Sequence, residues 1–467
     1  MGTTVFERRQ PAASVVAHAL ENTQQSVFWL DDIARPDYPV LRGAHSTDLV
    51  VVGGGYAGLW TAVRAKERDP QRRVILIEAS RIGWAASGRN GGFCESSLTH
   101  GYDNGASRWP DEMDLYERLG LQNLDEMQET VAKYDMDVDW ERTGTLSVAT
   151  EPHQIEWLAE AANFLNAEQI RAEVRSDTYL AGAWDKHGAA ILHPAKLAVE
   201  LARVATELGV EIFERSRVRS IESDRGVRQT VVTADGSVEA AHVALATNVF
   251  PSLLKRNRLM TVPVYDYVLM TEPLSDAQLT AIGWQNRQGI SDSANQFHYY
   301  RLSADNRILF GGYDAIYHYG GKVRAKYEDR PETFQRLASH FFTTFPQLEG
   351  LRFTHKWAGA IDSCSRFCAF FGTARGGRVA YATGFTGLGV GATRFAADVM
   401  LDKLEGMKTE RTENEMVRSR PIPFPPEPAA SIGVNLVRAS MDRADHNNGK
   451  RNLLLKALDA VGMGFDS

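Results

Sequence analysis

One short segment constrains the fold of this chain more than any other. An apolar, β-branched run over 48–52 leads into glycines spaced as Gly53-x-Gly55-x-x-Gly58, and Gly58 opens a helical stretch. A second apolar strand, 73–77, ends in Glu78, which lies 20 residues after Gly58. Such glycines let a pyrophosphate approach the amides at a helix N-terminus, and the acid accepts hydrogen bonds from a ribose. The pattern predicts a β-α-β dinucleotide-binding unit rather than a plain glycine-rich turn, and an acid here disfavours NADP.

Composition and charge exclude several classes of protein. A chain of 467 residues with 43% hydrophobic and 24% charged residues fits two domains or one composite globular domain. The net charge of −7 argues against a nucleic-acid partner. The three cysteines lack disulfide or zinc spacing, so we expect no metal. The sequence shows no secretory signal and no run of 18 apolar residues, so we expect a cytoplasmic protein without a membrane span.

The order of predicted elements indicates a mixed α/β (α+β) fold in which a Rossmann-like domain is assembled from discontinuous segments. We expect a leader over 1–45 and a tail over 409–467, extended around its proline-rich part. The expected cofactor domain comprises 46–105, 186–255 and 356–408. The expected substrate domain, with a large antiparallel sheet, comprises 106–185 and 256–355.

Two further glycine clusters favour a ligand. Residues 83–92 hold four glycines with a serine, an arginine and an asparagine directly after the ribose-binding acid, so a ligand-contacting loop is favoured over a mobile surface loop. Residues 384–391 lie between a strand and a helix near the far end of the chain. A helix N-terminus aimed at N1 and O2 of a flavin would stabilise the charge that the reduced ring gains. The alternative for this second cluster is a turn that serves packing alone.

One predicted strand carries the candidate substrate-binding pair. With a period of two residues, Tyr299 and Arg301 share one face of the strand. A tyrosine and an arginine on one wall of a pocket fit a carboxylate, because a guanidinium binds it as a fork. An ion pair of Arg301 with Asp292 or Asp305 is an equally weighted alternative.

Taken in this order, the motifs resemble the D-amino-acid-oxidase-like flavoproteins, and most closely the gamma-glutamylputrescine oxidoreductase branch of FAD-dependent amine oxidases. The resemblance covers roughly residues 25–430. It rests on the first glycine motif with Glu78, the 79–92 segment, His193-Pro194, the 299–307 hairpin, the 357–359 segment and the 387–390 turn.

The resemblance implies FAD and the oxidation of a C–N bond in an amine or amino acid, with hydride transfer to flavin N5 and hydrolysis of the imine. It implies Tyr299 and Arg301 as catalytic residues. It implies cofactor contacts by Gly53, Gly55, Tyr56, Ala57, Gly58, Glu78, Ala79, Arg81, Ser87, Gly88, Arg89, Asn90, Gly91, Gly92, Val218, Thr247, Gly359, Gly387, Leu388, Gly389 and Val390.

Two departures from the relatives leave alternatives open. Monomeric sarcosine oxidases carry a lysine that promotes reaction with oxygen, and the corresponding strand 308–310 has none. We expect an oxidase that uses O2 and forms H2O2, with a dehydrogenase using another acceptor as the alternative. Cys364 and Cys368 do not match the cysteine that binds flavin covalently in some relatives, so we expect non-covalent FAD. A nicotinamide-dependent dehydrogenase and a non-catalytic flavoprotein are the competing classes.

Overall fold

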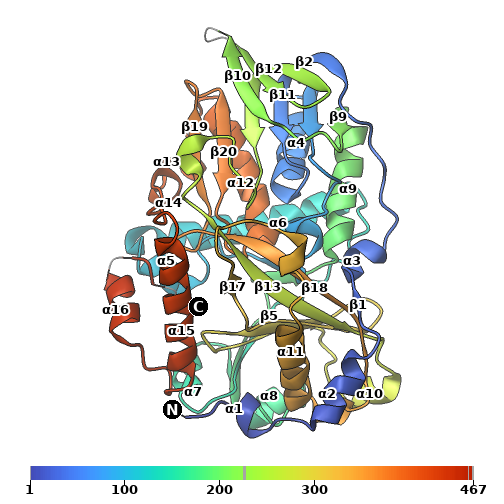
Figure 1. Cartoon of the computed structure of the whole chain (residues 1–467), viewed down its shortest axis with the longest axis vertical. Helices are drawn as coiled ribbons and strands as arrows, with labels where there is room; N and C mark the ends of the chain where they lie inside the picture. The colour runs from blue at the N-terminus through green and yellow to red at the C-terminus, as the bar shows by residue number, and fades with distance from the viewer. Residues whose placement is uncertain (1, 225–227, 461, 465–467) are drawn as a thin grey trace.

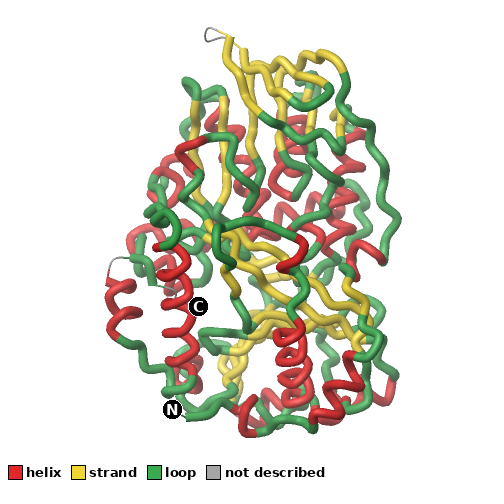
Figure 2. Tube along the Cα trace, viewed as in Figure 1, coloured by secondary structure: helices red, strands yellow, loops and turns green. Residues whose placement is uncertain are grey.

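Two large sheets lie one above the other along the long axis of the molecule (Figure 1). The computed structural model describes residues 2–224, 228–460 and 462–464. Helices pack around both sheets, as Figure 2 shows. The mixed α/β architecture that the sequence predicts is confirmed.

The upper sheet in Figure 1 is the cofactor sheet, and its centre is parallel. Its strands run in the order β10-β11-β12-β2-β3-β9, and β20, which also pairs with β19, joins it at β12. Every residue of β3 is buried, as expected for a parallel strand covered on both faces. The strands are β2 (Gly43–Val52), β3 (Val74–Ile77), β9 (Val210–Phe213), β10 (Ser220–Asp224), β11 (Arg228–Val232), β12 (Gly236–Leu245), β19 (Phe370–Ala374) and β20 (Val379–Thr383). Three separate stretches of the chain therefore build one sheet.

Three helices pack together against the cofactor sheet: α4 (Tyr56–Arg68), α9 (Pro194–Glu207) and α12 (Gly389–Leu404). Helix α4 contacts both of the others, so the first and last glycine motifs belong to one packed layer. Apolar side chains of the three helices and the sheet form a continuous buried core. This layer brings the N-termini of α4 and α12 into the same part of the molecule.

The lower sheet, here called the substrate sheet, is mostly antiparallel. Its order is β1-β18-β13-β16-β15-β14-β5-β7-β6, with β17 paired to β13. The strands are β1 (Gln24–Gln25), β5 (Thr145–Ala149), β6 (Phe164–Leu165), β7 (Ala181–Asp185), β13 (Val262–Thr271), β14 (Gly289–Asp292), β15 (His298–Leu302), β16 (Ile308–Gly312), β17 (Ile316–Tyr317) and β18 (Phe353–Ser363). Helix α11 (Pro331–Thr344) covers its lower face (Figure 1).

Alternation along β13 decides which side chains face the cofactor sheet. Tyr265, Tyr267 and Leu269 enter the core against α11. Val264 and Asp266 point to the opposite face, as the period of two requires. The face that is not covered by α11 is therefore free to form the wall of a cavity.

The expected domain boundary at 356 falls inside β18, which runs through Ser363 and pairs with β13 of the substrate sheet. Helix α7 (Gln154–Leu158) is short and precedes β6.

The C-terminal tail is more structured than its proline content suggests. It contains α13 (Glu410–Glu413), α14 (Glu415–Arg418), α15 (Ala429–Asp445) and α16 (Leu453–Ala460). The backbone N–H of Gly2 donates to the carbonyl of His446 at 2.9 Å, so the N-terminal segment lies against the C-terminal end of α15. None of the described helices combines the length and apolarity that a membrane crossing requires.

The remaining elements connect or cover the two sheets. A separate two-stranded sheet consists of β4 and β8, which pair antiparallel. These elements are α1 (Val5–Arg8), α2 (Ala13–Leu20), α3 (Phe28–Asp31), β4 (Phe93–Glu95), α5 (Tyr102–Ala106), α6 (Met113–Lys133), α8 (Ala167–Glu173), β8 (Ala189–Ile191) and α10 (Asp276–Ile282).

Candidate active site

A cavity of about 1900 Å³ is lined by residues from both sheets and from the C-terminal tail. The turn between β2 and α4 forms one part of its wall, and β13 and β15 of the substrate sheet form another. This volume exceeds the usual range for a pocket that holds one small molecule. A dinucleotide and a substrate therefore fit in it together.

The first glycine motif is a close-packed turn. A Cβ on Gly53 would lie 2.3 Å from the carbonyl oxygen of Ala246, and Gly53 has a φ of +117°. A Cβ on Gly58 would lie 1.9 Å from the carbonyl oxygen of Gly53. Ser87 Oγ accepts a hydrogen bond from the backbone N–H of Tyr56 at 2.9 Å, which ties the 83–92 loop to the start of α4. The motif thus exposes bare backbone to the cavity at a helix N-terminus.

Glu78 lies at the end of β3, is 7% exposed and lines the cavity. Its Oε2 accepts from the Gly54 N–H at 2.7 Å. Its Oε1 accepts from the Ser80 N–H at 2.7 Å and from Trp84 Nε1–H at 3.1 Å. Burial raises the pKa of this carboxyl, and the two backbone donors oppose that shift. With two acceptor sites per oxygen, Oε2 keeps one site for a ligand hydroxyl.

The 83–92 loop is anchored at several points. Asn90 Nδ2 donates to the carbonyls of Ala86 and Ser87 at 3.0 Å, and Asn90 Oδ1 accepts from the Gly92 N–H at 2.8 Å. Trp357 Nε1 of β18 donates to the carbonyl of Arg89 at 2.8 Å. These bonds fix the loop between the two sheets.

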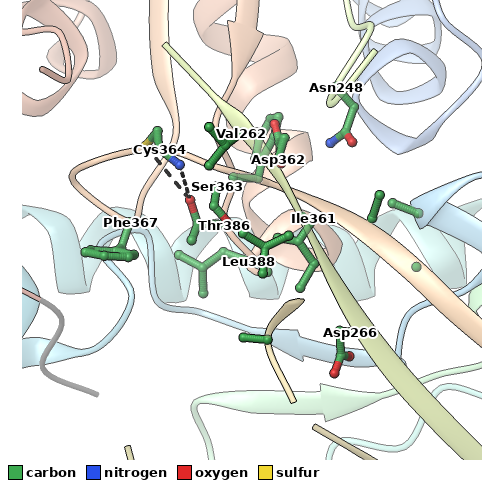
Figure 3. A pocket seen from close by; sticks show the side chains of 18 of the residues that line it. Asn248, Val262, Asp266, Ile361, Asp362, Ser363, Cys364, Phe367, Thr386 and Leu388 are labelled. Carbon is green, nitrogen blue, oxygen red and sulfur yellow. Dashed lines mark hydrogen bonds between the residues drawn. The ribbon is translucent and has the colours of Figure 1, made fainter. Parts of the chain in front are cut away.

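The third glycine motif forms the entry to α12. Asp362, at the end of β18, accepts from the Gly384 N–H at 2.5 Å and from the Thr383 hydroxyl at 3.2 Å. Burial raises the pKa of Asp362 to about 6. Figure 3 shows Asp362, Thr386 and Leu388 in the same part of the cavity lining. The carboxylate therefore holds the turn that leads to the helix N-terminus at the cavity.

Tyr299 lines the cavity from β15. Its hydroxyl donates to Asp266 Oδ2 on β13. Burial, and then the negative charge of Asp266, raise the pKa of Tyr299 well above its ordinary value, so the phenol stays protonated. A tyrosine and a carboxylate thus meet on the cavity-facing side of the substrate sheet.

Arg301 is placed differently from Tyr299, although both lie on the same strand face. It is 2% exposed and is not among the residues that line the cavity. Its Nη1 donates to the carbonyl of Leu192 at 2.7 Å, and the guanidinium carbon lies 5.0 Å from the centre of the Trp29 ring. Burial lowers its pKa to about 9. Asp292 and Asp305, its alternative partners, accept hydrogen bonds from His298 and Arg307 instead.

The structure brings most of the predicted cofactor residues to the cavity. Those in its lining are Gly53, Gly55, Tyr56, Ala57, Glu78, Ala79, Ser87, Arg89, Asn90, Gly91, Val218, Thr247, Gly359, Gly387, Leu388, Gly389 and Val390. Those outside it are Gly58, Arg81, Gly88 and Gly92. The three glycines allow close backbone packing, since a Cβ on any of them would lie within 2.2 Å of a carbonyl oxygen. Arg81 turns away, because its Nη2 donates to the carbonyls of Arg35 and Pro36.

Several lining residues were missed by sequence reasoning. They are Trp84, Asn248, Asp266, Asp362, Thr386 and, from α15, Val434, Val437 and Met441. Trp84 lies within the 83–92 glycine cluster, six residues after Glu78, and this position could have predicted that it lines the cavity. The others reach the cavity through strand register or tail packing, which no local motif encodes.

Fold and cavity together fit a protein that binds a dinucleotide against the cofactor sheet and faces it with the substrate sheet. The donors at the N-termini of α4 and α12, the free acceptor site on Glu78 and the cavity volume all suit FAD. The chain belongs to the FAD dependent oxidoreductase family, DAO, which it matches over residues 48–403.

Curated relatives agree with this assignment. Gamma-glutamylputrescine oxidoreductase of Escherichia coli (strain K12) is 32% identical over 395 residues, 79% of this chain and 86% of that protein. A probable oxidoreductase, OrdL, of Haemophilus influenzae is 28% identical over 388 residues, 79% of this chain and 85% of that protein.

Solved structures share the fold. Glycine oxidase from Geobacillus kaustophilus superposes with a TM-score of 0.65 at 19% identity, covering 78% of this chain and 96% of that one. L-proline dehydrogenase from P. horikoshii superposes with a TM-score of 0.65 at 16% identity, covering 78% of this chain and 95% of that one.

Proposed function

We propose that this protein oxidises a C–N bond of an amine or amino acid with FAD and passes the electrons to O2. One observation carries the proposal: a single cavity joins the glycine motif at α4, the glycine turn at α12 and the polar face of the substrate sheet. The family and the names of the relatives, which include gamma-glutamylputrescine oxidoreductase and a glycine oxidase, support the class of substrate.

The residues of this chain fit the parts of FAD. The amides of the Gly53–Ala57 turn would hold the pyrophosphate, and Glu78 would hold the ribose. The turn 387–390 at α12 would lie against the ring system. When bound, the flavin accepts a hydride at N5, and the protein supplies orientation and electrostatics.

The substrate would lie between the flavin and the substrate sheet. Tyr299 lines this space and would orient the substrate. Arg301, whose guanidinium packs against Trp29, is retained as a candidate to bind the polar end of the substrate. The apolar lining from β13 and α15 excludes water from the carbon that is oxidised. Hydrolysis of the imine product would yield an aldehyde or a keto acid.

Non-covalent FAD is part of the proposal. Cys364 lies in the cavity lining, but its thiol donates to the carbonyl of Cys368 at 3.1 Å. Burial raises the pKa of Cys364, which disfavours the thiolate that covalent attachment needs. Cys368 is fully buried in the core of the cofactor domain.

An amine dehydrogenase with another acceptor is the second candidate, because the strand 308–310, which corresponds to the lysine-bearing strand of the monomeric sarcosine oxidases, contains no lysine. A non-catalytic flavoprotein is the third candidate.

The test is anaerobic titration of the purified yellow protein with a panel of amines and amino acids. Loss of flavin absorbance with one of them supports the proposal, and admission of air then separates oxidase from dehydrogenase. Acid denaturation should release intact FAD. If no amine or amino acid reduces the flavin, the proposal fails and a non-catalytic flavoprotein is favoured.

A further inference from the structure

Asp266 occupies the middle of the cavity-facing side of the substrate sheet. Val264 and Val268, two residues away on either side along β13, also line the cavity. On the neighbouring strand β18, the residue directly opposite is Gly359, which has no side chain to cover the carboxylate. In Figure 3, Asp266 lies apart from the group formed by Asp362, Cys364 and Thr386 at the α12 turn. The carboxylate is therefore presented to the substrate part of the cavity by an otherwise apolar strand face.

The position of this carboxylate is fixed by Tyr299. The tyrosine hydroxyl donates to Asp266 Oδ2. Its ring is held close to two glycines: a Cβ on Gly91 would lie 2.7 Å from the ring, and a Cβ on Gly311 would lie 2.8 Å from it. Phe93 meets the ring edge-on at 5.7 Å between centroids. A larger residue at either glycine would displace the tyrosine, so the glycines, Tyr299 and Asp266 form one positioned unit.

The surroundings of Asp266 contain donors and a second carboxylate. Burial raises its pKa to about 6, whereas the Tyr299 hydroxyl and the backbone N–H groups of Tyr267 and Gly312 oppose this shift. The charge of Asp314, after β16, adds to the rise. From the cofactor side, the nearby cation Arg89 is paired with Glu328 at 2.6 Å. A carboxylate in these surroundings is ionised at neutral pH and still basic enough to accept a proton.

We infer that Asp266 binds the ammonium group of the substrate and accepts its proton before the C–H bond breaks. This inference rests on the function proposed above. An alkylamine arrives protonated at neutral pH, and its nitrogen lone pair must be free when the adjacent carbon loses a hydride. The N–H bond breaks, the proton passes to a carboxylate oxygen of Asp266, and the electron pair stays on nitrogen. A bound flavin would accept the hydride with its two electrons, which leaves an iminium ion as the oxidised substrate.

The same geometry specifies the substrate class. A carboxylate centred on the substrate sheet attracts a cationic primary or secondary amine, whereas a carboxylate on the α-carbon of the substrate would be brought close to Asp266 and repelled. We therefore assign a cationic amine without an α-carboxylate as the preferred substrate.

The first measurement is ligand binding rather than turnover. tert-Butylamine is a cation at pH 7.5 and has no hydrogen on the carbon next to nitrogen, so it binds without being oxidised. Its dissociation constant is measured by calorimetry on wild-type holoenzyme, Asp266→Asn and Asp305→Asn. Asp305 is the matched control, because it lies on the β15–β16 hairpin and outside the cavity lining. Asp266→Asn should raise the constant by about 10-fold or more, and Asp305→Asn should leave it unchanged.

The second measurement is the pH profile of anaerobic flavin reduction. In the wild type, the rate should fall below a pH of about 6, where Asp266 becomes protonated. Asp266→Asn should lose this acid limb and slow reduction by about 100-fold or more. Tyr299→Phe removes a donor that lowers the pKa of Asp266, so the acid limb should move to higher pH.

The outcomes separate the inference from the proposed function. Unchanged tert-butylamine binding in Asp266→Asn, together with a retained acid limb, overturns the inference while the enzyme remains an amine oxidoreductase. If Asp266→Asn does not fold, an acid limb that stays in place in Tyr299→Phe overturns it. If no amine reduces the wild-type flavin, the proposed function fails, and tert-butylamine binding still decides the role of Asp266 as a cation site.

Discussion

Replacing Glu78 with glutamine tests the ribose site most sharply, because three donors from the described residues hold this carboxylate in place. Oε2 accepts one N–H, from Gly54, and Oε1 accepts two, from Ser80 and Trp84. Glutamine has one oxygen and one NH2 group. In the better orientation the NH2 takes the place of Oε2, where it faces the Gly54 N–H and removes the acceptor site left for the ribose.

The magnitudes follow from these bonds. An unsatisfied Gly54 N–H should lower the free energy of unfolding by about 1–3 kcal/mol. A lost hydrogen bond to a charged acceptor is worth about 1.5–3 kcal/mol, so FAD should bind about 10- to 150-fold more weakly. Flavin fluorescence measures the affinity, and urea unfolding of the flavin-free protein measures the stability.

Glu214→Gln is the control. Glu214 is 1% exposed and lies outside the cavity lining, and it likewise accepts backbone N–H groups, from Ile82 at 2.7 Å and Tyr38 at 3.3 Å. The Glu214→Gln variant should be less stable than the wild type and should keep its FAD affinity within about twofold. The reasoning about Glu78 is refuted if both variants lose the same stability and neither loses FAD affinity.

Three further outcomes are expected. Gly391→Ala should destabilise the protein by about 1–3 kcal/mol, because the new Cβ would lie 2.1 Å from the carbonyl oxygen of Glu95, whereas Gly389→Ala, with no atom closer than 3.9 Å, should be tolerated; thermal unfolding compares the two. Arg301→Met should lower stability, because the guanidinium packs against Trp29, and a strong rise in KM confined to carboxylate-bearing substrates would support Arg301 as a substrate ligand, whereas an unchanged KM would contradict that role. An oxidase should form one H2O2 per amine consumed in a peroxidase-coupled assay, and slow reoxidation of the reduced enzyme in air contradicts this.

How much the sequence predicts depends on how local each signal is. The glycine turn and Glu78 lie in one β-α-β unit, so spacing alone placed them at the cavity. Asp266 was missed because its strand is rich in aromatic and β-branched residues and resembles a buried one. Its importance arises only when sheet register brings Tyr299 beside it.

Arg301 shows a second limit. The alternation along β15 was predicted correctly, and Arg301 does lie on the face of Tyr299. The cavity ends before Arg301, however, because Trp29 from α3 lies against its guanidinium. Nothing in the local sequence of either segment encodes a contact between residues so far apart in the chain.

The tail helix α15 lines the cavity with Val434, Val437 and Met441, yet it lies beyond the 48–403 span that the family shares. The proposed cofactor site and the strand that carries Asp266 thus lie within the common fold, whereas part of the cavity wall comes from a segment outside it. Substitutions in α15 therefore change the shape of the cavity without changing the residues of the common fold. Substrate preference in this fold can thus diverge through the tail helix alone, while the residues that carry the chemistry stay the same.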